Sequence, residues 1–393
     1  MGDPWLSIIG LGEDGLAGLS PASREALDRA ELVFGGPRHL ALANADARGQ
    51  AWPVPFDIGP VLACRGRPTV VLASGDPFWF GAGGSLLPYL TPGEWQSFPA
   101  PSTFSLAANA LGWRLEEVHC LGLHAAPLTR LRPILGLGVR AICLLRDAAA
   151  VRELSEWLCA NGHEASDLWV MEALGGPRAR LRETRADSMT LTDITAPVAV
   201  AIRATGPGIS RASGLPDDLF AHDGQITKRP VRALTLSALA PHAGEVLWDI
   251  GTGSGSIGIE WLLAGGAHVH AIEADAARGA RARENAAGFG LSHRMTLHAS
   301  RAPDGLDTLP TPDAVFVGGG ASDTLLTRLW ELVPTGRRLV VNAVTLETEA
   351  LLAQWSARHG GTLLRIALAE ATPLGAKRGW RAALPIVQWS VTR

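Results

Sequence analysis

The stretch LWDIGTGSGSIGIEWLLAGGAHVHAIEADAARGARARENAAGFGL occupies residues 247–291. In it, an apolar run leads into Asp249, three alternating glycines follow within Gly251–Gly255, and helical spacing begins at Ser256. Glycines allow the backbone to approach a ligand closely, and free N–H groups at a helix start favour the ligand's negative end. Glu273 ends the next apolar run, where its carboxylate can accept hydrogen bonds from both hydroxyls of a ribose. This pattern predicts a nucleoside-binding site in an α/β domain.

The glycine spacing indicates which kind of nucleoside the site binds. A dinucleotide-binding fingerprint requires GxGxxG, and Ser256 occupies the position of its third glycine. Because GxGxG here follows an acidic residue, the stretch instead resembles motif I of the class I S-adenosylmethionine methyltransferases. A nicotinamide oxidoreductase is the less favoured alternative. The resemblance implies that S-adenosylmethionine is held by Asp249, Gly251, Thr252, Gly253, Ser254, Gly255 and Glu273.

Three further segments extend this predicted site. The resemblance implies cofactor contacts from Thr227 in QITKR and from Ala302 in SRAPDGL, which follows the third predicted strand. The GGGASD segment follows the fourth predicted strand, at the carboxyl edge of the sheet, where ligands of α/β proteins collect. We therefore expect Gly319, in the middle of the triple glycine, to contact the substrate.

Strand-like apolar runs alternate with helical patterns along the whole chain, which predicts α/β domains. Runs rich in Val, Ile and Leu that end at glycine are typical of strands buried on both faces. Ser20 followed by Pro21 predicts a helix start, and Gly162 predicts a helix end. Gly, Pro and Ser cluster in residues 204–217, where we expect a linker. The predicted strands are 7–12, 31–36, 69–75, 141–147 and 196–202, then 245–251, 268–275, 295–300, 313–320, 337–344 and 385–391.

The first half of the chain carries a different set of loops. IIGLG and ASGDP end predicted strands, and PSTF begins a predicted helix at residue 101. In order and approximate spacing, these segments resemble the tetrapyrrole methylase family, also called class III methyltransferases. Residues 36–66 are too irregular to assign. The resemblance implies a two-lobed α/β fold with the cofactor in the cleft between the lobes, held by Gly10, Gly12, Gly75, Asp76, Pro77, Ser102 and Thr103.

The order of the two halves is informative in itself. A tetrapyrrole methylase half followed by a Rossmann-like class I half resembles the precorrin-6Y methyltransferase family of aerobic cobalamin biosynthesis. The resemblance implies two S-adenosylmethionine sites, methylation at ring positions 5 and 15, and decarboxylation of the acetate at position 12, giving precorrin-8. Residues 1–205 would methylate position 5; residues 206–393 would methylate position 15 and decarboxylate. The alternative is a class I RNA or protein methyltransferase with an accessory amino-terminal domain.

Decarboxylation and recognition of the substrate's carboxylates require further residues. A general acid must protonate the carbon that loses carbon dioxide, and His222, Asp223 and Asn342 are our candidates. Guanidinium and ammonium groups suit the acetates and propionates at the rim of such a macrocycle. We expect substrate contacts from Arg229, Arg232, Lys377, Arg378 and Arg381.

Composition narrows the range of partners. The chain has 393 residues, more than one ordinary hydrophobic core fills, so we expect more than one domain. A net charge of -3 gives no basis for binding nucleic acid or an anionic membrane.

The four cysteines form no CxxC pair, and His268 and His270 have no third ligand, so we predict neither a disulfide framework nor a metal site. No basic segment precedes an apolar run at the start, so we expect a cytoplasmic protein; the resemblance implies a homo-oligomer.

Overall fold

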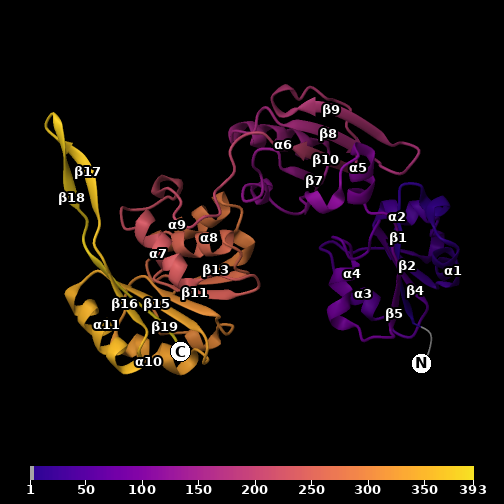
Figure 1. Cartoon of the computed structure of the whole chain (residues 1–393). Helices are drawn as coiled ribbons and strands as arrows, with labels where there is room; N and C mark the ends of the chain where they lie inside the picture. Colours follow the sequence, from indigo (N-terminus) through magenta and orange to yellow (C-terminus); the bar gives the residue numbers. More distant parts are fainter. Residues whose placement is uncertain (1–3) are drawn as a thin grey trace. The chain divides into compact units, whose positions relative to one another are not determined.

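The computed structural model describes residues 4–393 (Figure 1). Residues 1–3 lie outside the described residues. They begin the amino-terminal stretch in which the sequence was searched for a targeting signal. The chain divides into two compact units. The first unit ends at Gly208, and the second comprises Ile209–Arg393 together with Thr129–Pro133, a segment that the sequence analysis placed in the first domain. Within residues 4–393, no helix is long and apolar enough to cross a membrane.

The first unit begins with a five-stranded parallel sheet, here called the amino-terminal sheet. Its strands are β1 (Leu6–Leu11), β2 (Leu32–Gly35), β3 (Gly49–Ala51), β4 (Thr69–Ser74) and β5 (Trp95–Phe98), in the order β3-β2-β4-β1-β5. Every residue of β1 is buried, as expected for a strand covered on both faces. The helices are α1 (Pro21–Arg29), α2 (Pro37–Leu42), α3 (Gly59–Leu62) and α4 (Gly83–Leu86).

The predicted start of α1 is confirmed, because Ser20 Oγ accepts a hydrogen bond from the Ser23 N–H at 3.1 Å. The same kind of cap begins α5 (Thr103–Leu111), where Ser102 Oγ accepts from the Ser105 N–H at 3.1 Å. Both helices therefore start where a hydroxyl can satisfy an otherwise unpaired backbone donor.

A second five-stranded sheet completes the first unit. Its strands are β6 (Val118–Gly122), β7 (Arg140–Leu145), β8 (Asp167–Glu172), β9 (Arg180–Arg185) and β10 (Val198–Arg203), in the order β6-β7-β10-β8-β9. Only β6 and β7 pair in parallel, and α6 (Ala148–Ala160) follows β7. Strands β3, β5, β6, β8 and β9 were not predicted from the sequence. Strand β9 has a single apolar residue, Leu181, and its Arg180 and Arg182 pair with buried Glu172 of β8.

The second unit is built on one seven-stranded sheet. Five parallel strands, β11 (Val246–Ile250), β12 (His268–Ile272), β13 (Met295–His298), β14 (Ala314–Val317) and β15 (Arg338–Ala343), are extended by β19 (Ile386–Thr392) and β16 (Thr362–Ile366), in the order β13-β12-β11-β14-β15-β19-β16. The helices are α7 (Arg229–Leu239), α8 (Ser256–Leu263), α9 (Ala276–Gly288), α10 (Asp323–Leu332) and α11 (Leu346–His359). All six strands predicted for this half are confirmed.

A two-stranded ribbon is the main departure from the sequence reading of this unit. Strands β17 (Ala369–Leu374) and β18 (Lys377–Ala382) pair only with each other, and Figure 1 shows them extending beyond the seven-stranded sheet. No strand was predicted between residues 345 and 384, and in this segment Pro373 and Gly375 interrupt a strand pattern. The ribbon leaves from the end of β16 at Ile366, at the same edge of the sheet as the end of β15.

The structure corrects the predicted substrate contact of Arg232, whose side chain is fully buried in α7. Its Nε donates to Glu260 at 2.5 Å, and its Nη1 donates to Asp217 at 3.0 Å. Glu260 also accepts the backbone N–H groups of Gly214 and Leu215. Arg232 therefore anchors the segment after the linker to the second unit, and its guanidinium donors are already engaged by protein acceptors.

Replacing Arg232 with alanine should destabilise the second unit by about 3–5 kcal/mol, because it leaves the Glu260 carboxylate buried and unpaired. Urea denaturation of the whole chain measures this loss as an earlier unfolding transition. Arg229→Ala, on the same helix but exposed, is the matched control and should change the free energy of unfolding by less than about 0.5 kcal/mol. Equal effects of the two substitutions would contradict the anchoring role.

Candidate cofactor and substrate sites

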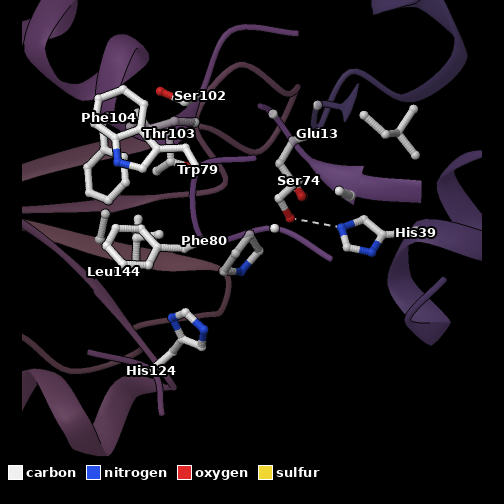
Figure 2. A pocket seen from close by; sticks show the side chains of 18 of the residues that line it. Glu13, His39, Ser74, Trp79, Phe80, Ser102, Thr103, Phe104, His124 and Leu144 are labelled. Carbon is white, nitrogen blue, oxygen red and sulfur yellow. Dashed lines mark hydrogen bonds between the residues drawn. The ribbon is translucent and has the colours of Figure 1, made fainter. Parts of the chain in front are cut away.

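A cavity of about 350 Å³ is lined by residues of both sheets of the first unit. Its lining comes from the loops after β1 and β4, from the start of α5, and from β7, β8 and β10. Figure 2 shows Trp79, Phe80 and Leu144 on one side of the cavity, and Ser74 and His39 on the other. One wall is therefore apolar and the opposite wall is polar.

The structure brings four of the predicted cofactor residues of this half together at the cavity. Gly12, Gly75, Ser102 and Thr103 all line it, although they come from three separate segments of the chain. They meet because the carboxyl ends of neighbouring parallel strands lie at one edge of a sheet. The cavity is the place in this unit where a folded nucleoside can contact them together.

Gly10, Asp76 and Pro77 were assigned to the cofactor from the sequence, but they are not among the residues that line the cavity. A Cβ atom at residue 10 would lie 1.9 Å from the Gly75 carbonyl oxygen, so Gly10 permits a close crossing of the backbone. The Asp76 carboxylate accepts the Phe78 N–H at 2.8 Å and so holds its own turn. These residues shape the loops that border the cavity, and their contacts with the cofactor stay predictions.

The polar wall of the cavity was not anticipated from the sequence. Arg38 and His39, at the start of α2, meet Ser74 at the end of β4; Arg38 Nη2 and His39 Nε2 each lie 2.8 Å from Ser74 Oγ. Glu13, just after β1, is ion-paired with Arg38 and, at 3.5 Å, with Arg178. No spacing in the sequence could identify this cluster, because it forms only when β1, β4 and β2 become neighbours.

Burial, reinforced by the positive charge of Arg38, lowers the pKa of His39 from its ordinary value of 6.5 to about 4. Burial, with a contribution from Arg178, also lowers the pKa of the Arg38 guanidinium. His39 is therefore neutral at physiological pH and leaves Arg38 as the cation nearest to Ser74 in this wall.

In the second unit, two buried carboxylates stand at the ends of β11 and β12. Asp249 Oδ2 accepts from Thr252 Oγ1 at 2.6 Å and from the Gly258 N–H at 3.2 Å. Its Oδ1 atom is buried and has no hydrogen-bond partner among the described residues. Glu273 Oε2 accepts the Gly253 N–H at 2.9 Å. Burial, opposed by these hydrogen bonds, raises the pKa of Asp249 to about 6, and the charge of Glu273 adds to the increase.

The loop between these carboxylates has the open backbone that the glycine pattern predicts. Gly251, Gly253 and Gly255 all have positive φ. A Cβ at residue 251 would lie 3.0 Å from the carbonyl oxygen of Gly319, which shows that the triple-glycine loop after β14 borders this site. A Cβ at residue 253 would have only the Gln225 carbonyl oxygen within 4 Å, at 3.9 Å, so this position opens into free space.

These residues fit S-adenosylmethionine. The unpartnered Asp249 Oδ1 is an acceptor suited to the ammonium group of the cofactor's methionine part, and Glu273 retains acceptor capacity for ribose hydroxyls. Thr227 is half-buried two residues after Gln225, and Ala302 is half-buried against the core beneath β14. Contacts of these side chains with the cofactor stay predictions.

Comparison with known families supports both halves of this description. Residues 6–190 match the family described as Tetrapyrrole (Corrin/Porphyrin) Methylases, and residues 218–393 match the precorrin methyltransferase domain family. A Sinorhizobium protein named precorrin-6Y C(5,15)-methyltransferase [decarboxylating] is 46% identical, with 99% of this chain and 97% of that protein aligned. This chain belongs to the precorrin-6Y C(5,15)-methyltransferase (decarboxylating) family.

Two further curated proteins and one solved structure are similar to this chain. A Mycobacterium tuberculosis protein of the same name is 38% identical, with 98% of this chain and 99% of that protein aligned. A shorter Saccharolobus solfataricus protein, named probable cobalt-precorrin-6B C(15)-methyltransferase (decarboxylating), is 36% identical over 34% of this chain and 71% of its own. A solved carboxyl-terminal domain from Rhodobacter capsulatus is 56% identical over 47% of this chain and all of that chain, with a TM-score of 0.46.

Family membership confirms several predictions made from the sequence. The fold class is a two-lobed tetrapyrrole methylase fold followed by a Rossmann-like class I fold, and the chain is a methyltransferase that uses S-adenosylmethionine. The nicotinamide oxidoreductase and the RNA or protein methyltransferase are not supported, because the relatives aligned over the full length carry the precorrin name.

The three candidate acids of the precorrin-6Y methyltransferase, Asp223, Asn342 and His222, differ in whether their contacts leave a proton to donate. Asp223 is held ionised, because the Gln225 N–H and the Arg278 guanidinium lower its pKa, so it cannot supply a proton at neutral pH. Asn342 is buried, and its amide is engaged with Thr235 and Gln388. Neither side chain therefore has a proton to donate, and the structure contradicts both as the general acid.

His222 is the third candidate acid. Its Nδ1 accepts the Gly224 N–H at 2.9 Å, which leaves the proton of the neutral ring on Nε2. The ring is half-buried in the segment before Gln225, whose carbonyl borders the glycine loop. A catalytic role for His222 stays a prediction.

The predicted cationic contacts of the precorrin-6Y methyltransferase occupy different places. Arg229 is exposed at the start of α7, whose Thr235 packs on Asn342 near the carboxyl end of β15. Lys377, Arg378 and Arg381 lie on β18 of the two-stranded ribbon, where all three are exposed. The ribbon begins at the same sheet edge as the glycine loop but extends beyond it, so these contacts also stay predictions.

The low pKa of His39 predicts how the first unit responds to acid. Its folded pKa of about 4 lies below the ordinary 6.5, so the unfolded chain binds the proton more tightly than the folded chain. The stability that depends on neutral His39 is fully present above pH 6.5 and is lost as the pH falls towards 4. Thermal unfolding at pH 7 and pH 5 should therefore show a smaller loss of stability in His39→Gln than in the unchanged chain. Parallel losses in the two proteins would contradict the buried, neutral histidine.

Proposed function

We propose that this chain transfers methyl groups from two molecules of S-adenosylmethionine to ring positions 5 and 15 of a precorrin and releases carbon dioxide from the acetate at position 12. The observation that carries the proposal is that one chain contains two separate cofactor-type loop sets, each in its own unit. The alignment of nearly the full chain with proteins named for the C(5,15) reaction supports it.

We assign position 5 to the first unit, and position 15 with decarboxylation to the second. The existence of a shorter relative named as a C(15)-methyltransferase (decarboxylating) supports the view that these reactions belong to separable parts of the chain. The differing architecture of the two units supports it as well, since a cleft between two sheets and an open sheet edge would present the macrocycle differently.

The bound cofactor supplies a sulfonium methyl group that is a strong electrophile. A meso carbon between two pyrroles is electron-rich, so the main work of the protein is to hold the nucleophilic carbon, methyl carbon and sulfur in line. In the second unit, Asp249 and Glu273 would fix the two ends of the cofactor, and the loop around Gly319 would limit where the macrocycle lies.

Decarboxylation leaves an electron pair that the conjugated macrocycle can accept, and a proton must then be delivered to carbon. We propose His222 as the donor, acting as the imidazolium after Nδ1 gives up the hydrogen bond from the Gly224 N–H and takes up a proton, since Asp223 is held ionised by its neighbours. The acetates and propionates of the substrate would be met by Arg229 and by Lys377, Arg378 and Arg381 of the ribbon. Self-association of the chain stays a prediction that rests on resemblance.

Binding of S-adenosylhomocysteine to the full chain tests the two-site proposal. Isothermal titration should give a stoichiometry of two for the unchanged chain and one for Gly253→Arg. The arginine side chain would enter the space beside the glycine loop, where only the Gln225 carbonyl oxygen lies within 4 Å of an added Cβ.

Gly336→Arg is the matched control for this titration. Gly336 also has positive φ and open surroundings, but it precedes β15, at the opposite edge of the same sheet. It should retain a stoichiometry of two. A value of one for the unchanged chain, or loss of binding in both variants, would reject the assignment of one cofactor site to each unit.

A further inference from the structure

Phe80 has a backbone conformation that aromatic residues rarely adopt. Its φ is 58°, in the left-handed region, where the Cβ atom of an L-residue crowds its own backbone. The residue is nevertheless 52% exposed and lines the cavity of the first unit. A glycine would satisfy this backbone without strain, so burial in the core does not explain the choice of phenylalanine.

The loop around Phe80 leaves the backbone little freedom to relax. The Pro77 carbonyl oxygen accepts the Gly83 N–H at 3.1 Å, which closes the loop. A Cβ atom at Gly81 would lie 2.4 Å from the same carbonyl oxygen, so residue 81 must be glycine or the loop must move. The loop therefore holds Phe80 in its strained conformation and directs its ring to the cavity.

The ring of Phe80 also reaches across to the second sheet. A Cβ atom on Gly122, in β6, would lie 2.9 Å from Phe80 Cδ1, so the ring occupies the space that a side chain at residue 122 would fill. The Phe104 ring is 5.9 Å away between centroids, and Trp79 packs on Phe104 at 4.9 Å. The ring is thus fixed between two sheets, with part of its surface open.

Figure 2 shows His39 and Ser74 on the opposite wall of the same cavity. Arg38, which also lines the cavity, donates to Ser74 Oγ and is ion-paired with Glu13. An apolar aromatic surface facing a cation and a hydroxyl is complementary to a flat conjugated ring that carries carboxylates at its rim. Gly12, Ser102 and Thr103, the predicted cofactor contacts, line the same cavity. The cavity therefore combines one surface for a ring, one for a carboxylate and one for a nucleoside.

We propose that Phe80 is a substrate-contacting residue on which a pyrrole ring of the macrocycle stacks, so that the position-5 carbon faces the cofactor loops of the first unit. This inference rests on the proposed function of that unit. The strained backbone is retained because it presents the ring to the substrate, and Gly122 is required because it leaves room for that ring.

The test uses the full chain and two ligands: an octacarboxylate porphyrin as a stable flat tetrapyrrole, and S-adenosylhomocysteine. Phe80→Ala should raise the Kd for the porphyrin in the first unit about 5- to 10-fold, and should raise KM for methylation at position 5 by a similar factor. Its Kd for S-adenosylhomocysteine should change less than about 2-fold. Phe80→Trp should retain porphyrin binding, because it keeps an aromatic face.

Two control variants separate stacking from structural effects. Phe78→Ala removes an exposed ring two residues away that packs on Trp95 and does not line the cavity, so porphyrin binding should persist. Phe80→Gly should weaken porphyrin binding as Phe80→Ala does, and its Tm should be about 2 °C above that of Phe80→Ala, because both lack the ring and only glycine relieves the backbone strain. Asn44→Gly, at an exposed residue with φ of 49°, relieves strain elsewhere and should leave porphyrin binding unchanged.

The outcomes distinguish the inference from the function on which it rests. If the unchanged chain binds the porphyrin and Phe80→Ala has the same porphyrin affinity and the same KM, the role of Phe80 is overturned. The proposed function of the first unit would still stand. A lower Tm together with weaker S-adenosylhomocysteine binding would assign Phe80 a purely structural role, which also overturns the inference. An unchanged chain that neither binds the porphyrin in its first unit nor methylates position 5 would reject the proposed function of that unit, and the inference with it.

Discussion

Both units depend on close backbone crossings at the carboxyl ends of their parallel strands. In the first unit, Gly10 lies so near the Gly75 carbonyl that a single methyl group would overlap it. In the second unit, Gly251 has the same relation, at a longer distance, to the loop of Gly319. Because side chains are absent at these crossings, loops from different strands converge and leave backbone groups and space for a ligand. The rest of each site is arranged around these crossings.

The second unit buries charged side chains at two places, where they have different consequences. The pair of Arg232 and Glu260 is complete, with partners for both groups, and it holds the segment after the linker in place. Asp249 is equally buried, but one carboxylate oxygen has no partner among the described residues. A buried acceptor that lacks a donor destabilises the unit without a ligand and favours a ligand that brings one. The same physical property, burial of charge, therefore stabilises the fold at one place and prepares a binding site at the other.

In the first unit, the proposed contacts with the macrocycle depend more on the shape of the cavity than on charge. Its cavity is bordered by Phe80, an aromatic residue with a strained backbone, and by Arg38, which is ion-paired with Glu13 and donates a hydrogen bond to Ser74. A fixed ring and a cation whose neighbours are already arranged lose little freedom when a rigid macrocycle binds. If each unit of the precorrin-6Y methyltransferase holds a cofactor, as proposed, the two units offer it different surroundings, which would suit two reactions at different positions of one ring.

The sequence by itself determined the features that are local in the chain. Strand runs, the cap at Ser20 and the glycine loop from Gly251 to Gly255 follow from periodicity and backbone preference, and the structure contains them. Only the tertiary structure decided which polar side chains face a ligand. Arg232 has the charge expected of a substrate contact but is buried. His39 lies in a stretch that showed no helix or strand periodicity, yet it lines a cavity. The reason is physical: the orientation and the partners of such side chains are set by strands that are distant in sequence and become neighbours only when the sheets assemble.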